Sequence, residues 1–135
     1  MTDENRRANV ALELVESASC RDAAELNAAS GHLKTAVNRL YYACFHAARA
    51  VLLTAGLEPK RHSGLRHMLS LHFVKTGLLP SSVSKTLAHL EDEREMADYI
   101  AASTLSADEY EAYRAEAEEL LELVRRFLST AGWTD

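Results

Sequence analysis

The stretch from residue 32 to residue 57 constrains the fold more than any other part of the chain. Its apolar residues recur at steps of three and four with no interior Gly or Pro, which is typical of an α-helix with one buried stripe. Arg39, Tyr42, His46 and Arg49 recur at the same steps. Residues so spaced share one face of a helix. The sequence therefore predicts a largely buried helix, ended by Gly56, with a guanidinium and an imidazole on one face.

The composition of the whole chain indicates an all-α fold. Only two prolines and five glycines occur in 135 residues, and 47% of the residues are hydrophobic. This length is typical of one domain with one core, which we expect to span residues 1–135 with its core over residues 5–130. We predict an antiparallel up-and-down bundle of four to five helices.

The two helices that flank the central one are predicted from periodicity and capping residues. The first is expected over residues 3–30, with a kink or break over residues 17–22, and Gly31 then lets the chain reverse. The third is expected over residues 64–76, capped by Ser63. Their predicted inward residues are Val10, Ala11, Leu14, Val15, Ala18, Ala24 and Leu26, and then Leu65, Met68, Leu69, His72 and Phe73.

Two more helices complete the predicted bundle. The fourth is expected over about residues 82–102 after Pro80, with Ala97 and Ala101 among its inward residues. The fifth opens with Ser106 and Glu109, the spacing of a capping box, in which each residue satisfies a backbone amide of the other.

The charge of the chain limits the partners it can bind. A formal net charge of −5 argues against a broad basic surface for duplex nucleic acid, because such binding depends on neutralising phosphates. A local basic site remains compatible with this charge. The most basic stretch is KRHSGLRH, residues 60–67, at the start of the third helix.

The cysteine pattern predicts reduced thiols, and the hydropathy of the chain predicts neither a signal peptide nor a membrane span. Cys20 and Cys44 lie on helical patterns rather than in a CxxC motif, so we expect reduced core residues. No clustered ligand set suggests zinc, and neither a metal nor a cofactor is expected. The first ten residues lack the apolar core of a signal peptide, and no apolar run approaches the length of a membrane span. A cytoplasmic protein is expected.

Four motifs occur in order along the central part of the chain: NRLYYACF at 38–45, KRHSG at 60–64, HFVKTG at 72–77 and REMADY at 94–99. Together they resemble the HEPN family, small prokaryotic helical domains often encoded beside a minimal nucleotidyltransferase. The resemblance covers about residues 36–99. It implies a four- or five-helix bundle, usually a homodimer. Many members are metal-independent ribonucleases, and several are toxins of toxin–antitoxin pairs.

The resemblance also implies roles for two residues of the central helix. The family's ribonuclease signature is an Arg, four to six residues, and a His, and Arg39 and His46 match it with six. His46 would then be the general acid or base, and Arg39 would stabilise the charged phosphorane. The chain departs from the pattern at two positions. Leu40 replaces a polar residue that commonly follows the Arg, and Ala48 replaces a Tyr that the nucleotidyltransferase modifies in the best-defined toxins.

Six further residues are candidate contacts to substrate: Asn38, Tyr42, His62, Arg66, Arg94 and Asp98. On the central helix Asn38 precedes Arg39, and Tyr42 lies between Arg39 and His46. The residues of the basic stretch would clamp a phosphate at a helix N-terminus, where free amides favour anions. Arg94 and Asp98 are one helical turn apart, which predicts a partly buried ion pair and a second phosphate contact.

Several interpretations remain open at this level. The first is a homodimeric ribonuclease toxin that cleaves single-stranded RNA and is restrained by a nucleotidyltransferase antitoxin. The second is a noncatalytic adaptor that binds a nucleotide or that partner, and the third is a structural dimerising subunit. Arg39 and His46 would then be an ion-paired Arg and a histidine that fills a dimer seam. A rival pair, Arg66 and His72, has five intervening residues but would not share a helix face.

Overall fold

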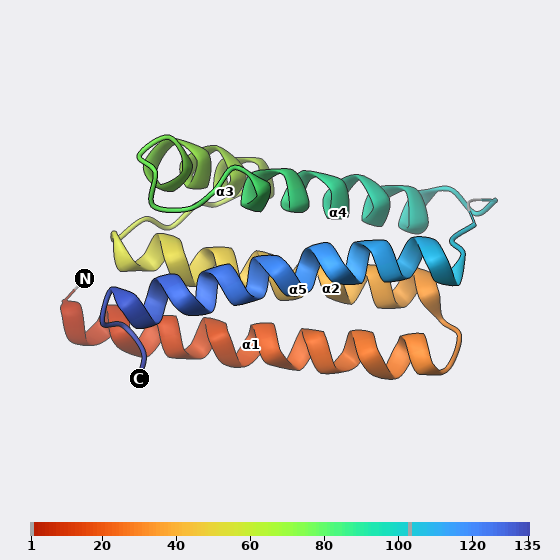
Figure 1. Cartoon of the computed structure of the whole chain (residues 1–135), viewed down its shortest axis with the longest axis horizontal. Helices are drawn as coiled ribbons and strands as arrows, with labels where there is room; N and C mark the ends of the chain where they lie inside the picture. Colours follow the sequence, from red (N-terminus) through yellow and green to blue (C-terminus); the bar gives the residue numbers. More distant parts are fainter. Residues whose placement is uncertain (1, 103) are drawn as a thin grey trace.

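The computed structural model describes residues 2–102 and 104–135, and within them the chain is helical with no strand (Figure 1). The all-α prediction is confirmed. The elements are α1 Asp3–Ala29, α2 Leu33–Thr54, α3 His62–Leu69, the π-helical segment η1 Ser70–Val74, α4 Ser82–Tyr99 and α5 Ala107–Thr130.

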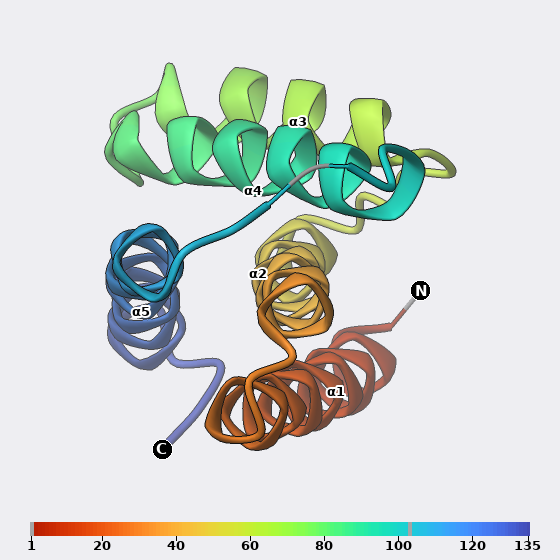
Figure 2. The same ribbon diagram turned by 90° about the vertical axis from the view of Figure 1, so that its right-hand side faces the viewer.

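Helix α2 is the centre of the molecule. Seen along the bundle, α1 lies below α2, α5 lies to its left, and α3 and α4 lie above both α2 and α5 (Figure 2). Thirteen of the 22 residues of α2 are buried. Removing apolar surface from water is the main force that stabilises a fold, so the core is organised around this helix.

The first two helices form an antiparallel hairpin with closely packed backbones. Gly31 has a φ of 82°, a left-handed conformation that glycine adopts without strain, and it reverses the chain as predicted. The Ser17 hydroxyl donates a hydrogen bond of 2.7 Å to the carbonyl oxygen of Ala43 on α2. So short a side chain reaches the neighbouring backbone only where the helices approach closely. The small side chain of Ala43 permits that approach.

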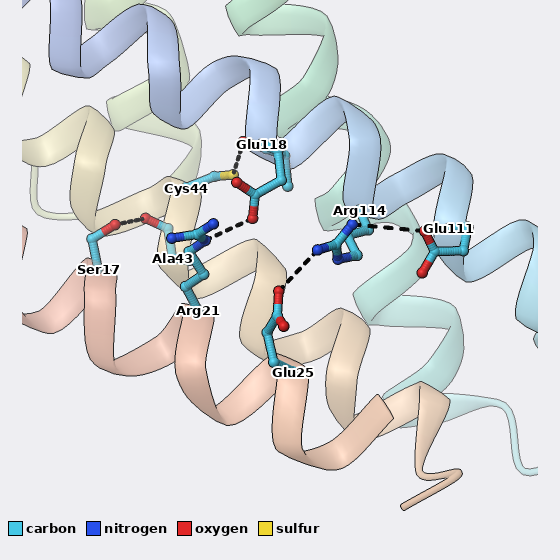
Figure 3. A network of polar contacts seen from close by, with 9 residues as sticks. Ser17, Arg21, Glu25, Ala43, Cys44, Glu111, Arg114 and Glu118 are labelled. Carbon is cyan, nitrogen blue, oxygen red and sulfur yellow. Dashed lines mark hydrogen bonds and ion pairs between the residues drawn. The ribbon is translucent and has the colours of Figure 1, made fainter. Parts of the chain in front are cut away.

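Polar contacts also join α1 and α2 to α5 (Figure 3). Arg21 of α1 lies 2.6 Å from Glu118 of α5, and Arg114 of α5 lies 3.1 Å from Glu25 of α1. These side chains are half exposed, so each pair contributes about 0–1 kcal/mol to stability. Their effect is to set the register of α5 along α1.

The prediction of a break in the first helix was wrong. Helix α1 runs without interruption through residues 17–22, and its buried residues are Val10, Ser17, Cys20 and Ala24. The small side chains that weakened the apolar pattern are the ones that face α2. Val15 and Leu26 were predicted to point inward, but they are 64% and 70% exposed because they lie off this stripe.

The third predicted helix differs in both register and cap. It begins at His62, and Arg61 occupies the N-cap position with no side-chain hydrogen bond, so Ser63 is not the cap. After Leu69 the chain forms η1, where the Lys75 amide bonds to the carbonyl of Ser70 five residues earlier. A π turn contains more residues than an α turn, so it rotates the following side chains. His72 is therefore exposed, whereas Phe73 is buried as predicted.

The last two helices agree more closely with their predictions. Helix α4 ends at Tyr99, so Ala101 lies beyond it and is exposed, contrary to its predicted inward position. The capping box at the start of α5 is confirmed. The Ser106 hydroxyl accepts from the Glu109 amide, and the Glu109 carboxylate accepts from the Ser106 amide, both at 3.1 Å.

Candidate functional site

Helix α2 keeps one side open to solvent. Between residues 36 and 53 the partly exposed positions are Asn38, Arg39, Tyr42, His46 and Arg49, and every other residue there is buried. Cys44 lies on the opposite side of α2, where its thiol reaches the Ala117 carbonyl of α5. In Figure 2 no described helix lies over the side of α2 that faces away from α5. We call these five positions the open face of α2.

Arg39 is held at the open face by its neighbour. Its Nε and Nη2 donate to the Asn38 carboxamide oxygen at 3.0 and 2.7 Å. Its guanidinium carbon lies 5.0 Å from the centre of the Tyr42 ring, within the range of a cation–π contact. The Asn38 amide nitrogen lies 3.4 Å from a carboxylate oxygen of Asp98 on α4. Arg39 is therefore oriented by an amide oxygen and an aromatic ring rather than neutralised by a carboxylate.

His46 is held from α1. Its Nδ1 lies 2.7 Å from Oε2 of Glu13, and Nε of Arg49 lies 3.2 Å from Oε1 of the same carboxylate. The side chains of His46 and Glu13 are 23% and 18% exposed. The contact occupies Nδ1, so Nε2 is the ring nitrogen left for exchange with a bound molecule. A neutral or protonated ring can be held in this way.

Helix α4 brings a second guanidinium beside Tyr42. Arg94 lies 3.3 Å from Asp98, and its side chain is only 13% exposed, so the predicted partly buried ion pair is confirmed. Its guanidinium lies 5.1 Å from the ring of Tyr41 and 5.8 Å from that of Tyr42. Its Nε is buried with no hydrogen-bond partner among the described residues. Arg94 thus keeps donor capacity that Asp98 does not use.

His62 is the first residue of α3 and packs against aromatic rings of α2 rather than lying in a solvated loop. Its Nδ1 lies 2.7 Å from the Tyr41 hydroxyl, and its ring centre lies 4.5 Å from that of Phe45. Burial, and then the nearby charge of Arg94, lower the pKa of His62 from its ordinary value of 6.5. Burial raises the pKa of Tyr41. Both groups are therefore favoured in their neutral forms.

Arg66 has a separate environment from the other candidates. Its Nε lies 2.9 Å from Oε2 of Glu91, whose side chain is 12% exposed, but the two atoms lack hydrogen-bond geometry. The contact is an ion pair between α3 and α4. His72 of the rival pair is exposed on η1. The basic stretch is thus divided, with His62 turned toward aromatic rings and Arg66 toward a carboxylate.

Arg39 and His46 share the open face but have different partners. Arg39 bonds to Asn38, His46 bonds to Glu13, and Tyr42 stands between them in sequence.

A separate groove lies between α1 and α5, lined in part by Leu14, Arg21, Ala47, Glu118 and Arg125. Both of its arginines are paired with glutamates, whereas Arg39 of the open face is bonded to a neutral amide.

The residues that sequence reasoning missed are those that support the open face. Glu13 was not singled out, yet it holds both His46 and Arg49. It lies three positions after Val10 and four before Ser17, both of which are buried on α1. A carboxylate on a buried stripe needs a partner, and that position was the available signal. Phe45 also contributes, because Arg49 lies 5.9 Å from its ring.

Metal-binding clusters and membrane-spanning helices bear on the kind of site. Within residues 2–102 and 104–135, no group of three or more His, Cys, Asp or Glu side chains is placed to hold a metal ion. Among the same residues, no helix combines the length and apolar character needed to cross a membrane.

Comparisons with known proteins point to one family. A family model described as HEPN domain matches residues 12–131. A UPF0332 protein of Thermotoga maritima is 30% identical over 109 residues, which cover 81% of this chain and 83% of that protein. A Methanocaldococcus jannaschii protein named "Putative toxin" is 35% identical over 95 residues, 70% of each chain. A UPF0332 protein of Pyrococcus horikoshii is 39% identical over 67 residues, 50% of this chain and 47% of that protein.

Proposed function

The chain belongs to the HEPN family, and we propose that it is a metal-independent endoribonuclease that acts as the toxin of a toxin–antitoxin pair. The observation that supports the chemistry most directly is the open face of α2, where Arg39 and His46 both reach solvent. The biological role is supported by relatives, since two Methanocaldococcus jannaschii proteins similar to this chain carry the name "Putative toxin".

The proposed reaction is an internal transfer of the RNA phosphate. Nε2 of His46 takes the proton from a ribose 2′-hydroxyl, and the 2′ oxygen forms a bond to the adjacent phosphorus. The bond from phosphorus to the 5′ oxygen breaks, and that oxygen takes a proton. The products are a 2′,3′-cyclic phosphate and a 5′-hydroxyl. The Arg39 guanidinium stabilises the extra negative charge on the phosphorane.

We propose that a second copy of the chain completes the site. One imidazole can begin the reaction as a base, but the leaving oxygen needs an acid at the same time. In a homodimer the His46 of a second copy would supply that proton, with two open faces turned toward each other. The separate partners of Arg39 and His46 within one chain are compatible with a site assembled from two chains.

Single-stranded RNA is the substrate that the surface fits best. Tyr42 presents a ring beside the guanidiniums of Arg39 and Arg94, and single strands bind through base stacking on aromatic rings and through cations that follow the backbone. Asn38 and Asp98 orient these two arginines. We propose that His62 and Arg66 support this surface through Tyr41 and Glu91, as outer members of the substrate-binding set.

The proposed antitoxin is a minimal nucleotidyltransferase. Ala48, the position of the modified Tyr in the best-defined toxins, is fully buried and carries no group that could be modified. We therefore propose that the partner restrains this chain by covering the open face. Its binding would then exclude RNA from Arg39 and His46.

The deciding experiment is RNA cleavage in EDTA by the purified protein and its His46→Ala variant. A labelled single-stranded RNA should yield fragments with 2′,3′-cyclic phosphate ends, and the variant should be slower by about 100-fold or more, as expected when a general acid or base is lost. His89→Ala, which removes an exposed histidine of α4 outside the proposed site, is the matched control and should cleave normally. Undiminished cleavage by the His46 variant would exclude the proposal.

A second candidate function is a noncatalytic adaptor. It is favoured by the separate hydrogen bonds of Arg39 and His46, which satisfy each side chain without a substrate. In that case the purified protein would leave RNA intact. A nucleotide or the partner enzyme would raise its melting temperature, because a ligand that binds only the folded state stabilises it by mass action.

A further inference from the structure

We infer that Glu13 is a positioning residue for His46, because its carboxylate selects the imidazole tautomer whose Nε2 can accept a proton. The inference rests on the proposed ribonuclease function for its catalytic consequence. Its structural part, the choice of tautomer, can be tested without any RNA. Glu13 lies on α1 and belongs to no part of the Arg-to-His signature on α2.

The first support is the geometry of the Glu13 carboxylate. One oxygen lies 2.7 Å from Nδ1 of His46, and the other lies 3.2 Å from Nε of Arg49. Because each oxygen has its own partner, rotation of the carboxylate would break at least one contact. The side chain of Glu13 is 18% exposed and that of His46 is 23% exposed, so water competes only weakly for these contacts.

The second support is the hydrogen-bonding capacity of the two groups. An ionised carboxylate only accepts hydrogen bonds, so Nδ1 of His46 must carry a proton when the two are in contact. In the neutral ring the other nitrogen, Nε2, is then unprotonated. It is the nitrogen that must take the proton from the 2′-hydroxyl. A second group that fixes the tautomer of a catalytic imidazole is a general feature of histidine catalysis.

The third support is the rest of the surroundings of His46. Phe45 places its ring edge-on to the imidazole at 5.4 Å, and Arg49 is held on the far oxygen of Glu13. Arg49 is cationic and Phe45 is apolar, so neither offers an acceptor to Nδ1. Glu13 supplies the acceptor that fixes the ring. Its carboxylate also stabilises the imidazolium that forms in the proposed reaction.

A purely structural role for Glu13 makes a different prediction. If the contact serves only to join α1 to α2, its loss should lower stability and leave the tautomer and the turnover rate of the folded protein unchanged. The two roles can therefore be separated by the tautomer itself and by the division of any loss between kcat and KM.

The experiment uses the full chain with Glu13→Ala and Glu13→Gln, and with Glu119→Gln as a matched control on the exposed surface of α5. Long-range proton–nitrogen NMR spectra of labelled protein, assigned with a His46→Gln variant, report which ring nitrogen carries the proton. We expect Nδ1–H in the wild type and the control, and a shift toward Nε2–H in Glu13→Ala. In RNA cleavage, kcat should fall ten- to a hundredfold in Glu13→Ala, with KM within about twofold.

The outcomes separate the two proposals. Nδ1–H retained in Glu13→Ala, or wild-type kcat in both Glu13 variants, would overturn the role of Glu13 while leaving the ribonuclease in place. A wild-type protein that does not cleave RNA would overturn the proposed function, and the NMR spectra would still decide the tautomer. If Glu13→Ala does not fold, Glu13→Gln decides, because its amide can both accept and donate and should give a mixture of tautomers.

Discussion

The side-chain oxygen of Asn38 accepts two hydrogen bonds from Arg39, the residue that follows it, at 3.0 Å from Nε and 2.7 Å from Nη2. Successive residues of a helix point about 100° apart, so this contact draws the guanidinium back along α2 toward the Tyr42 ring. The other contacts of the guanidinium are with the Tyr42 ring and with the sulfur of Cys20, which lies 4.0 Å from Nη1. The position of the proposed phosphate ligand is therefore set by neutral groups.

Asn38→Ala should weaken the proposed cleavage while leaving the fold intact. It removes two hydrogen bonds to Arg39, each of which contributes on the order of 1 kcal/mol, so a loss of about 30-fold in rate is expected. Single-turnover cleavage at saturating RNA measures this effect. Thr35→Ala, an exposed change one turn earlier on α2, is the control. An Asn38 variant as fast as the wild type would show that Arg39 needs no such support.

Arg94 should contribute to RNA binding through both its positive charge and the planar shape of its guanidinium. Arg94→Lys keeps the charge but loses the planar contacts with Tyr41 and Tyr42 that hold the cation in place. Affinity should therefore fall about two- to fivefold, as for cation–π contacts of about 0.5–1 kcal/mol, with an unchanged salt dependence. Arg94→Gln should also lower the slope of log affinity against log salt by about 0.7. Fluorescence anisotropy with a labelled single strand measures both.

The control for Arg94 is Arg126→Gln, because Arg126 is an exposed arginine of α5 that pairs with Glu122. Its salt slope should match that of the wild type. Equal slopes for the Arg94 and Arg126 variants would mean that Arg94 does not contact phosphate.

The His62 environment predicts a loss of stability in acid. The pKa of His62 is lowered in the folded state by burial and by Arg94, with Glu91 opposing them, so the unfolded chain binds a proton at this position more readily. The resulting loss of folding free energy is absent above the unfolded pKa of about 6.5. It grows as the pH falls below that value and is complete below the folded pKa. Urea denaturation at pH 7.5 and pH 5 measures the free energy of unfolding.

His62→Gln provides the comparison for that measurement. Glutamine does not titrate and can still accept a hydrogen bond from the Tyr41 hydroxyl. The wild type should therefore lose more stability than His62→Gln between pH 7.5 and pH 5. Equal losses in the two proteins would show that His62 is not shielded from protonation.

Ser106→Ala tests the start of α5. It removes the hydroxyl that accepts from the Glu109 amide, and loss of such an N-cap costs about 1 kcal/mol of stability. Ser19→Ala, on the exposed surface of α1, removes the same hydroxyl from a helix interior and should not lower stability. The free energies of unfolding of the two variants in urea give the comparison.

Local signals in the sequence were enough for much of the fold. The reversal at Gly31, the capping box at Ser106 and the buried stripe of α2 each depend on residues close together in the chain, and all three are as predicted. The π turn after Leu69 was not foreseen, because its register depends on how Phe73 packs against Phe127 of α5. Ser17 was misjudged for a similar reason, since its partner, Ala43, lies on another helix.

The candidate site could be predicted only in part. Helical spacing is a property of one element, so it correctly placed Arg39 and His46 on one side of α2. The contact between Glu13 and His46 spans 33 positions, and no local pattern indicates which residue of α1 will face a given residue of α2. The same holds for the contact of His62 with Tyr41, which depends on the path of the chain between α2 and α3.

The enclosure of α2 on all sides but one has a consequence for how such a protein can change. Of the five positions of the open face only Tyr42 packs against the core, whereas the backbone that carries all five is among the most firmly held parts of the molecule. New reactive groups could be introduced at Asn38 or Arg39 without removing the partners of Glu13, and the core would hold the backbone that carries them rigid. Helix α2 thus forms the centre of the bundle and also carries surface side chains that can be exchanged.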